Sequence, residues 1–252
     1  MKGFHQHLIL TTCLAAVCTT VLANDFEPYS EFILMGGITT IDAEDTDLVV
    51  TASETDKLVQ TNGNDWDTWT GQIGFGYVFS FVEDFSTGDV AWFPIINPQI
   101  NLYVIGDSDI TGDVWRFESP AYNQADYTMG FRSTRVMFDL GVTIAAIDRF
   151  SIYALGGLGA AWNSTSFNAQ GKDGLDCPID NVNLNEEDSS GFAYEFGGGL
   201  TFAATDRVAI SLEYLYTGFD DVDLGGDPAL DIDGSNLYIN AQSVLLGLRF
   251  AI

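Results

Sequence analysis

In "DTWTGQIGFGYVFSF", residues 67–81, large apolar residues alternate with small or polar ones. The large apolar side chains fall on one face, at Trp69, Ile73, Phe75, Tyr77, Phe79 and Phe81. The small and polar residues fall on the other face, at Thr68, Thr70, Gln72, Gly74, Gly76 and Ser80. A period of two residues predicts a β-strand with one apolar and one polar side.

Three further stretches repeat this alternation, within residues 135–144, 192–202 and 208–216. A soluble β-sandwich also alternates, so the character of the second face decides between the two kinds of sheet. Here that face carries mostly Gly, Ala, Ser, Thr and Gln, with a few charges of both signs. Small and polar residues suit the inside of a narrow barrel, and an aromatic-rich face suits lipid. The sequence therefore predicts a membrane barrel rather than a soluble sandwich or a lipocalin-like barrel.

The chain contains eight such strands. They are expected near residues 29–42, 67–81, 95–106, 127–146, 149–165, 190–204, 206–219 and 236–252. Short links such as "AIDRF" and "AATDR" alternate with long acidic connections, which is typical of outer-membrane barrels. We therefore predict an all-β fold, a closed antiparallel eight-stranded transmembrane β-barrel. Residues 107–118 could extend strands above the membrane, which leaves ten strands as the alternative.

The first 23 residues differ from the rest of the chain. Lys2 precedes an apolar run, and Ala23 offers a cleavage position, so we expect a signal peptide at 1–23 and the barrel at 24–252. Both histidines, His5 and His7, lie in this segment, and Cys177 is the single cysteine outside it. A mature chain without histidine lacks the usual general base, so we expect no enzyme. A formal net charge of −27 argues against nucleic-acid binding.

Two motifs carry a resemblance to a known family. "YALGGLGAAW", residues 153–162, looks like a glycine-rich strand, and "LLGLRFAI", residues 245–252, looks like a barrel-assembly signal. Gly247 and Phe250 match that signal, whereas Ile252 replaces its usual final aromatic residue. With these motifs, residues 29–252 resemble the small outer-membrane β-barrel family of outer-membrane protein A and the opacity-type porins.

The resemblance implies a location in the outer membrane of a Gram-negative bacterium. The partners that it implies are outer-membrane lipid, lipopolysaccharide and the barrel-assembly machinery, which reads the last strand before that strand pairs with the first. Closure is also required physically, because an open strand edge in lipid leaves backbone groups without hydrogen bonds.

If the bulky faces contact lipid, six charged residues point into the lumen. They are Glu31, Arg135, Asp139, Glu195, Glu213 and Arg249. Isolated buried charges are costly, so we expect an ionic network, with Arg249 and Glu213 on neighbouring strands as its leading pair. Such a network predicts a plugged barrel with a structural or surface-interaction role, in adhesion or envelope integrity. The alternative is a narrow cation-preferring channel for small solutes.

The acidic loops suggest one metal site. In "DSDITGDVWRFE", residues 107–118, potential oxygen ligands fall at the spacing of an EF-hand-like calcium loop. They are Asp107, Asp109, Thr111, Asp113 and Glu118. Ile110 and Trp115 depart from that pattern, and no flanking helices are expected. Calcium is thus the only cofactor that the sequence suggests, and the surface ligand of the loops is not readable from it.

Overall fold

The computed structural model describes residues 28–51, 54–61, 68–80, 86–87, 90–91, 95–172, 182–225 and 235–252. The predicted signal peptide at 1–23 and Cys177 lie outside these ranges. Eight long strands account for most of the described chain. They are β1 (Tyr29–Ala43), β4 (Thr68–Ser80), β7 (Ile95–Trp115), β8 (Asn123–Ile147), β9 (Phe150–Gly171), β10 (Val182–Ala203), β11 (Val208–Leu224) and β12 (Ser235–Ala251).

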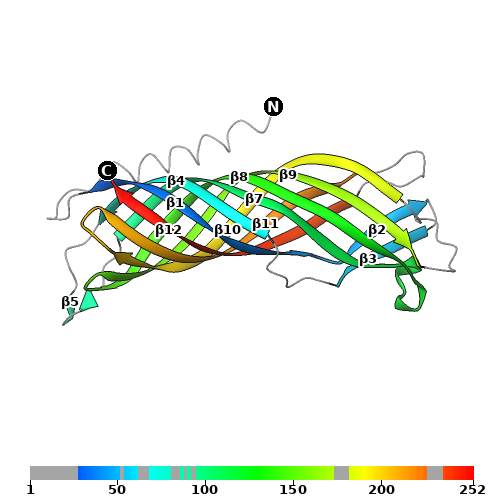
Figure 1. Cartoon of the computed structure of the whole chain (residues 1–252), viewed down its shortest axis with the longest axis horizontal. Helices are drawn as coiled ribbons and strands as arrows, with labels where there is room; N and C mark the ends of the chain where they lie inside the picture. Colours follow the sequence, from blue (N-terminus) through cyan, green and yellow to red (C-terminus); the bar gives the residue numbers. More distant parts are fainter. Residues whose placement is uncertain are drawn as a thin grey trace, which may run out of the picture.

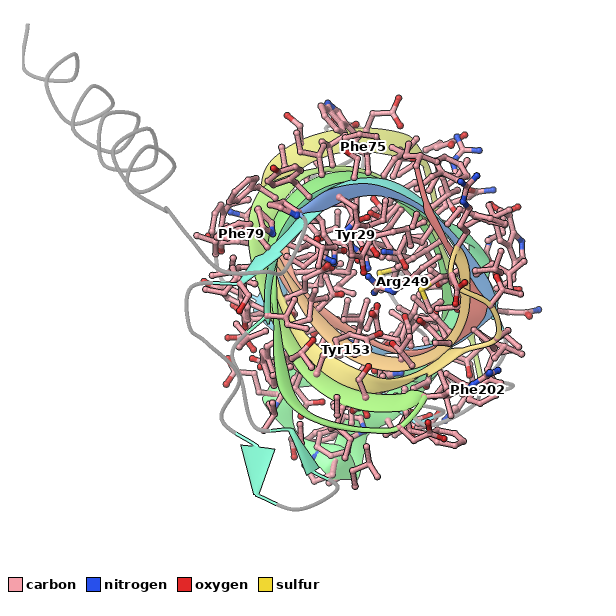
Figure 2. The ribbon with its side chains drawn as sticks, turned by 90° about the vertical axis from the view of Figure 1, so that its left-hand side faces the viewer. Tyr29, Phe75, Phe79, Tyr153, Phe202 and Arg249 are labelled. Carbon is pink, nitrogen blue, oxygen red and sulfur yellow. The ribbon has the colours of Figure 1, made fainter. Side chains whose placement is uncertain are left out.

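These strands form a closed ring, seen end-on in Figure 2. The ring runs in the order β7-β4-β1-β12-β11-β10-β9-β8, and antiparallel pairing of β7 with β8 closes it. The first and last strands of the ring, β1 and β12, pair along nearly their whole length, from Glu31 opposite Ala251 to Ala43 opposite Ile239. The predicted eight-stranded antiparallel barrel is therefore confirmed.

The shorter elements lie at the two ends of the barrel. The hairpin of β2 (Thr46–Thr51) and β3 (Glu54–Gln60) pairs with the tip of β7, at the right-hand end of Figure 1. At the opposite end, β5 (Ser86–Thr87) pairs with β6 (Val90–Ala91), which pairs with β8. Two 3-10 turns, η1 (Arg116–Glu118) and η2 (Pro120–Tyr122), join β7 to β8. Residues 107–115 continue β7 and add no strand to the ring, contrary to the ten-strand alternative.

The alternation of the strands places one set of side chains outside the ring and the other set inside. On β4, Trp69, Phe75 and Tyr77 are exposed, whereas Thr70 and Gln72 are buried. Figure 2 shows the same arrangement, with Phe75, Phe79 and Phe202 outside the ribbon and Arg249 and Tyr153 within it. The outer side chains form an apolar belt around the ring. No helix among the described residues is long and apolar enough to cross a membrane.

Beyond the apolar belt, the strands carry polar side chains on their outward face and apolar side chains on their inward face, the reverse of the arrangement within the belt. Strands β7 to β10 are 21–25 residues long, whereas about 9–11 residues suffice to cross a bilayer. At their tips the outward side chains are polar, for example Asp107, Asp109 and Asp126, and the inward ones are apolar. The inward apolar core of this end includes Leu48, Leu58, Ile110, Met129, Phe131, Phe167, Leu184, Phe219, Leu224, Leu237 and Ile239. Polar outer faces over an apolar interior indicate that the tips stand in water.

Candidate functional site: the charged layer of the lumen

All six charged residues that were predicted to point inward lie inside the ring. Their exposed fractions are between 0 and 7%. Glu31 comes from β1, Arg135 and Asp139 from β8, Glu195 from β10, Glu213 from β11 and Arg249 from β12. Each occupies an inward position in the alternation of side chains along its strand. The local sequence pattern therefore directs charges from five strands into the lumen.

Arg249 is the centre of the first group. Its Nη1 lies 2.7 Å from Glu31 Oε1, and its Nη2 lies 3.3 Å from Glu213 Oε2. Tyr153 of β9 donates its hydroxyl to Glu213 Oε2 at 2.6 Å, and the guanidinium lies 5.0 Å from the centre of the Tyr153 ring. Arg249 Nε also donates to Ser211 Oγ at 3.1 Å. One cation therefore links β12 to β1, β9 and β11.

Arg135 is the centre of the second group. Its Nε donates to Glu195 Oε2 at 3.2 Å, and its guanidinium lies 4.2 Å from the centre of the Tyr103 ring on β7. The neighbouring carboxylate, Asp139, accepts a hydrogen bond of 2.6 Å from Asn101 Nδ2 on its Oδ2 atom. No salt bridge to Asp139 occurs among the described residues.

The charged layer separates two different parts of the lumen. On the side of the short β10–β11 turn lies a vestibule of about 630 Å³, which reaches from Asp206 and Arg207 at the mouth to Glu31 and Arg249. On the other side lies the apolar core of the strand tips. The interior therefore changes from an open vestibule through charged groups to packed hydrocarbon.

The predicted calcium loop does not form, so that interpretation of residues 107–118 is wrong. Residues 107–115 belong to the extended strand β7, and Glu118 lies in η1 beyond it. Alternate residues of a strand are about 7 Å apart, so Asp107, Asp109, Thr111 and Asp113 line up along one face instead of surrounding an ion. In the part of the chain that the structure describes, no group of three or more His, Cys, Asp or Glu side chains could hold a metal.

Lys172 offers Asp113 a different partner. Its Nζ lies 3.1 Å from both Asp113 Oδ1 and Asp126 Oδ1 at the strand tips. Burial by itself would raise the pKa of Asp113, but hydrogen bonds from Lys172 and Asn123 and the charge of Lys172 outweigh it and lower this pKa below its usual value. The acidic tips are thus partly neutralised by a side chain of the chain itself.

The three residues of the expected assembly signal lie on β12 and directly after it. Gly247 faces Met35 of β1, and a Cβ at Gly247 would overlap the β1 backbone. Phe250 packs on the outer face, 6.3 Å from Phe32 of β1 between ring centres. Ile252 donates its amide to the Ser30 carbonyl at 2.9 Å. All three lie where β1 pairs with β12, which we call the seam. That the assembly machinery recognises them stays a prediction.

Sequence reasoning missed the neutral partners of the charges. Tyr103, Asn101 and Tyr153 complete the layer, although only the charged residues had been singled out. Their inward positions could have been found from alternation along β7 and β9. The apolar interior of the tips was missed as well. On β7, β10 and β11 β-bulges reverse the alternation there, but on β8 and β9 it continues, so the inward positions of Phe131 and Phe167 were open to the same reasoning.

The family model for the outer membrane protein beta-barrel domain matches residues 9–250. No curated protein sequence matches the chain significantly. Among solved structures, the chain is similar to Ail, the attachment invasion locus protein of Yersinia pestis, at 14% identity and a TM-score of 0.36, over 88% of this chain and 99% of that one.

Two further solved structures are similar over most of their length. OprG from Pseudomonas aeruginosa matches at 15% identity and a TM-score of 0.36, over 90% of this chain and 97% of that one. The outer membrane protease OmpT from Escherichia coli matches at 9% identity and a TM-score of 0.40, over 93% of this chain and all of that one. With the family model matched along nearly the whole sequence, the chain belongs to the outer membrane protein β-barrel domain family and resides in the outer membrane of a Gram-negative bacterium.

Proposed function

We propose that the chain is a non-conducting scaffold of the outer membrane that presents its strand tips and loops to molecules outside the cell. The observation that carries this proposal is the lumen, which is filled at two successive levels. The charged groups around Arg249 and Arg135 form the first level, and the apolar core around Phe131 and Phe219 forms the second.

Physical size supports the same conclusion. An eight-stranded barrel has an interior just wide enough for its own side chains. A hydrated ion that passed the charged layer would also have to pass Phe131, Phe167 and Phe219, which lie in the interior with at most 3% of their surface exposed. Moving an ion into an apolar region without a compensating partner is very costly. This order of layers favours a scaffold over the cation-channel alternative.

The strand tips support the surface-interaction part of the proposal. They extend the barrel beyond the apolar belt and present polar outward faces on four neighbouring strands. Arg132 on this surface pairs with Glu186, so both signs of charge are present there. Lipopolysaccharide, which surrounds such tips, is the partner proposed for this surface, and the barrel-assembly machinery is the partner proposed for the seam. The proposal includes no catalytic role. Histidine is the usual general base, and both histidines lie within the first 23 residues, which we expect to be removed as a signal peptide.

Planar-bilayer recording tests the proposal. We expect purified, refolded protein to give no large, stable conductance steps, while an open porin recorded in the same way does. A matched double variant, Phe131→Ala with Phe219→Ala, removes two aromatic side chains from the apolar level. If that level is the barrier, this variant is expected to pass more ionic current than the wild type. Large and stable steps from the wild-type protein would overturn the scaffold assignment.

A further inference from the structure

Two buried carboxyl groups of the charged layer lie side by side without a cation between them. Asp139 of β8 and Glu195 of β10 flank the same residue of β9, Gly157. A Cβ at Gly157 would overlap Asp139 Oδ1, so the Asp139 side chain lies across this glycine toward β10. Glu195 pairs with Gly157 from the other side, so the two carboxyl groups approach each other over this glycine.

Each carboxyl group has one oxygen with a protein donor and one without. Asp139 Oδ2 accepts from Asn101, and Glu195 Oε2 accepts from Arg135 Nε. Asp139 Oδ1 and Glu195 Oε1 have no hydrogen-bond partner among the described side chains. Both residues are at most 3% exposed. Two ionised carboxylates in contact repel each other strongly, and such pairs commonly hold one proton between them.

We propose that the Asp139–Glu195 pair binds a proton at neutral pH, with Asp139 as the protonated partner that donates to Glu195 Oε1. Glu195 forms an ion pair with Arg135, whereas Asp139 has no ion pair within the described residues. One proton here satisfies both remaining oxygens and leaves three carboxylates facing two arginines. This inference does not depend on whether the barrel conducts.

The surroundings of the pair support a proton rather than a metal ion. The other charged groups facing it are Arg135 on its own strand, Glu213 on β11 and, farther along the layer, Arg249 and Glu31 on β12 and β1. Among the described residues, no three of the acidic side chains are close enough together to hold a metal. The neighbouring titratable tyrosines, Tyr103 on β7 and Tyr153 on β9, pack on the two arginines.

Asp139→Asn is the variant that tests the proposal, because its amide reproduces the proposed hydrogen bonds. The new Nδ2 can donate to Glu195 while the amide oxygen accepts from Asn101. In infrared spectra of the folded protein in lipid vesicles at neutral pH, we expect the carbonyl stretch of one protonated carboxylic acid in the wild type. That band is expected to vanish in Asp139→Asn and to persist in the control Glu187→Gln, which changes an exposed acid on the same strand as Glu195.

The pH dependence of urea unfolding gives a second and independent readout. A proton held in the folded state but released on unfolding makes the unfolding constant of the wild type rise with pH, by up to about tenfold per pH unit above the usual aspartate range. Asp139→Asn is expected to lack this dependence and to be at least as stable at neutral pH.

Three results would overturn the proposal. They are the absence of a carboxylic-acid band in the wild type, equal pH dependence of wild type and Asp139→Asn, and loss of stability when sodium is replaced by a bulky organic cation. The last result would assign the pair to a bound metal ion.

Discussion

Arg249 connects β12 to three other strands, because it binds Glu31, Glu213 and Tyr153. Removing one partner from a buried, hydrogen-bonded ion pair costs about 3–5 kcal/mol, since the remaining charge stays buried without compensation. We therefore expect Arg249→Met to lower the free energy of unfolding by about 3–5 kcal/mol. Urea unfolding in lipid vesicles, followed by tryptophan fluorescence, measures this change.

Arg207→Met is the matched control for this prediction. Arg207 is an exposed arginine in the β10–β11 turn, and surface substitutions usually change stability by no more than about 0.5 kcal/mol. A second control adds Glu31→Gln and Glu213→Gln to Arg249→Met, which removes the unpaired charges and should recover part of the lost stability. An Arg249→Met protein that unfolds at the same urea concentration as the wild type would contradict the structural role of this layer.

At the scale of the element, β12 has two chemically different faces at its pairing with β1. Phe250 contacts Phe32 on the outer, lipid-facing side, while Arg249 faces the lumen. A charged side chain on the lipid face of a barrel strand is destabilising, and here it would also disturb the strand that closes the ring. We expect Phe250→Asp to lose most of its membrane-inserted protein, as measured by the amount recovered in outer-membrane fractions.

Ile252→Phe is the companion variant on the same face of the chain. It keeps an apolar side chain on the outward face and supplies the aromatic residue with which the family signal usually ends. We therefore expect a normal amount of protein in outer-membrane fractions. Wild-type levels of Phe250→Asp would show that the outer face of this strand does not govern assembly.

At the scale of the whole molecule, the closed hydrogen-bonded ring and the filled interior should make the barrel resistant to detergent. Every strand of the ring is paired on both sides, and the lumen contains charged and apolar layers. Unheated protein in dodecyl sulfate gels is therefore expected to stay folded and run faster than heated protein. Equal mobility before and after heating would contradict a stable closed barrel.

Much of the fold was accessible from the sequence because strand alternation is a local property. The outward positions of Phe75 and Tyr77, the inward positions of Arg135 and Glu213, and the pairing of first and last strands all follow from period two together with the need to close a sheet in lipid. The calcium interpretation was wrong because ligand spacing was read as a loop, whereas Asp107–Asp113 continue a strand.

The eight strands, their two faces and the set of charges inside the ring follow from local alternation and could be predicted. Which of these charges meet depends on the register across several strands, so it emerges only in the folded ring. On β7, β10 and β11, bulges near Ile105–Ser108, Leu184–Glu187 and Phe219–Val222 add a residue that exchanges the inward and outward sets, whereas the alternation of β8 and β9 continues unbroken through the tips. The contact of Asp139 with Glu195 likewise requires Gly157 between them, because strand register across three strands is a property of the closed ring and not of any one segment.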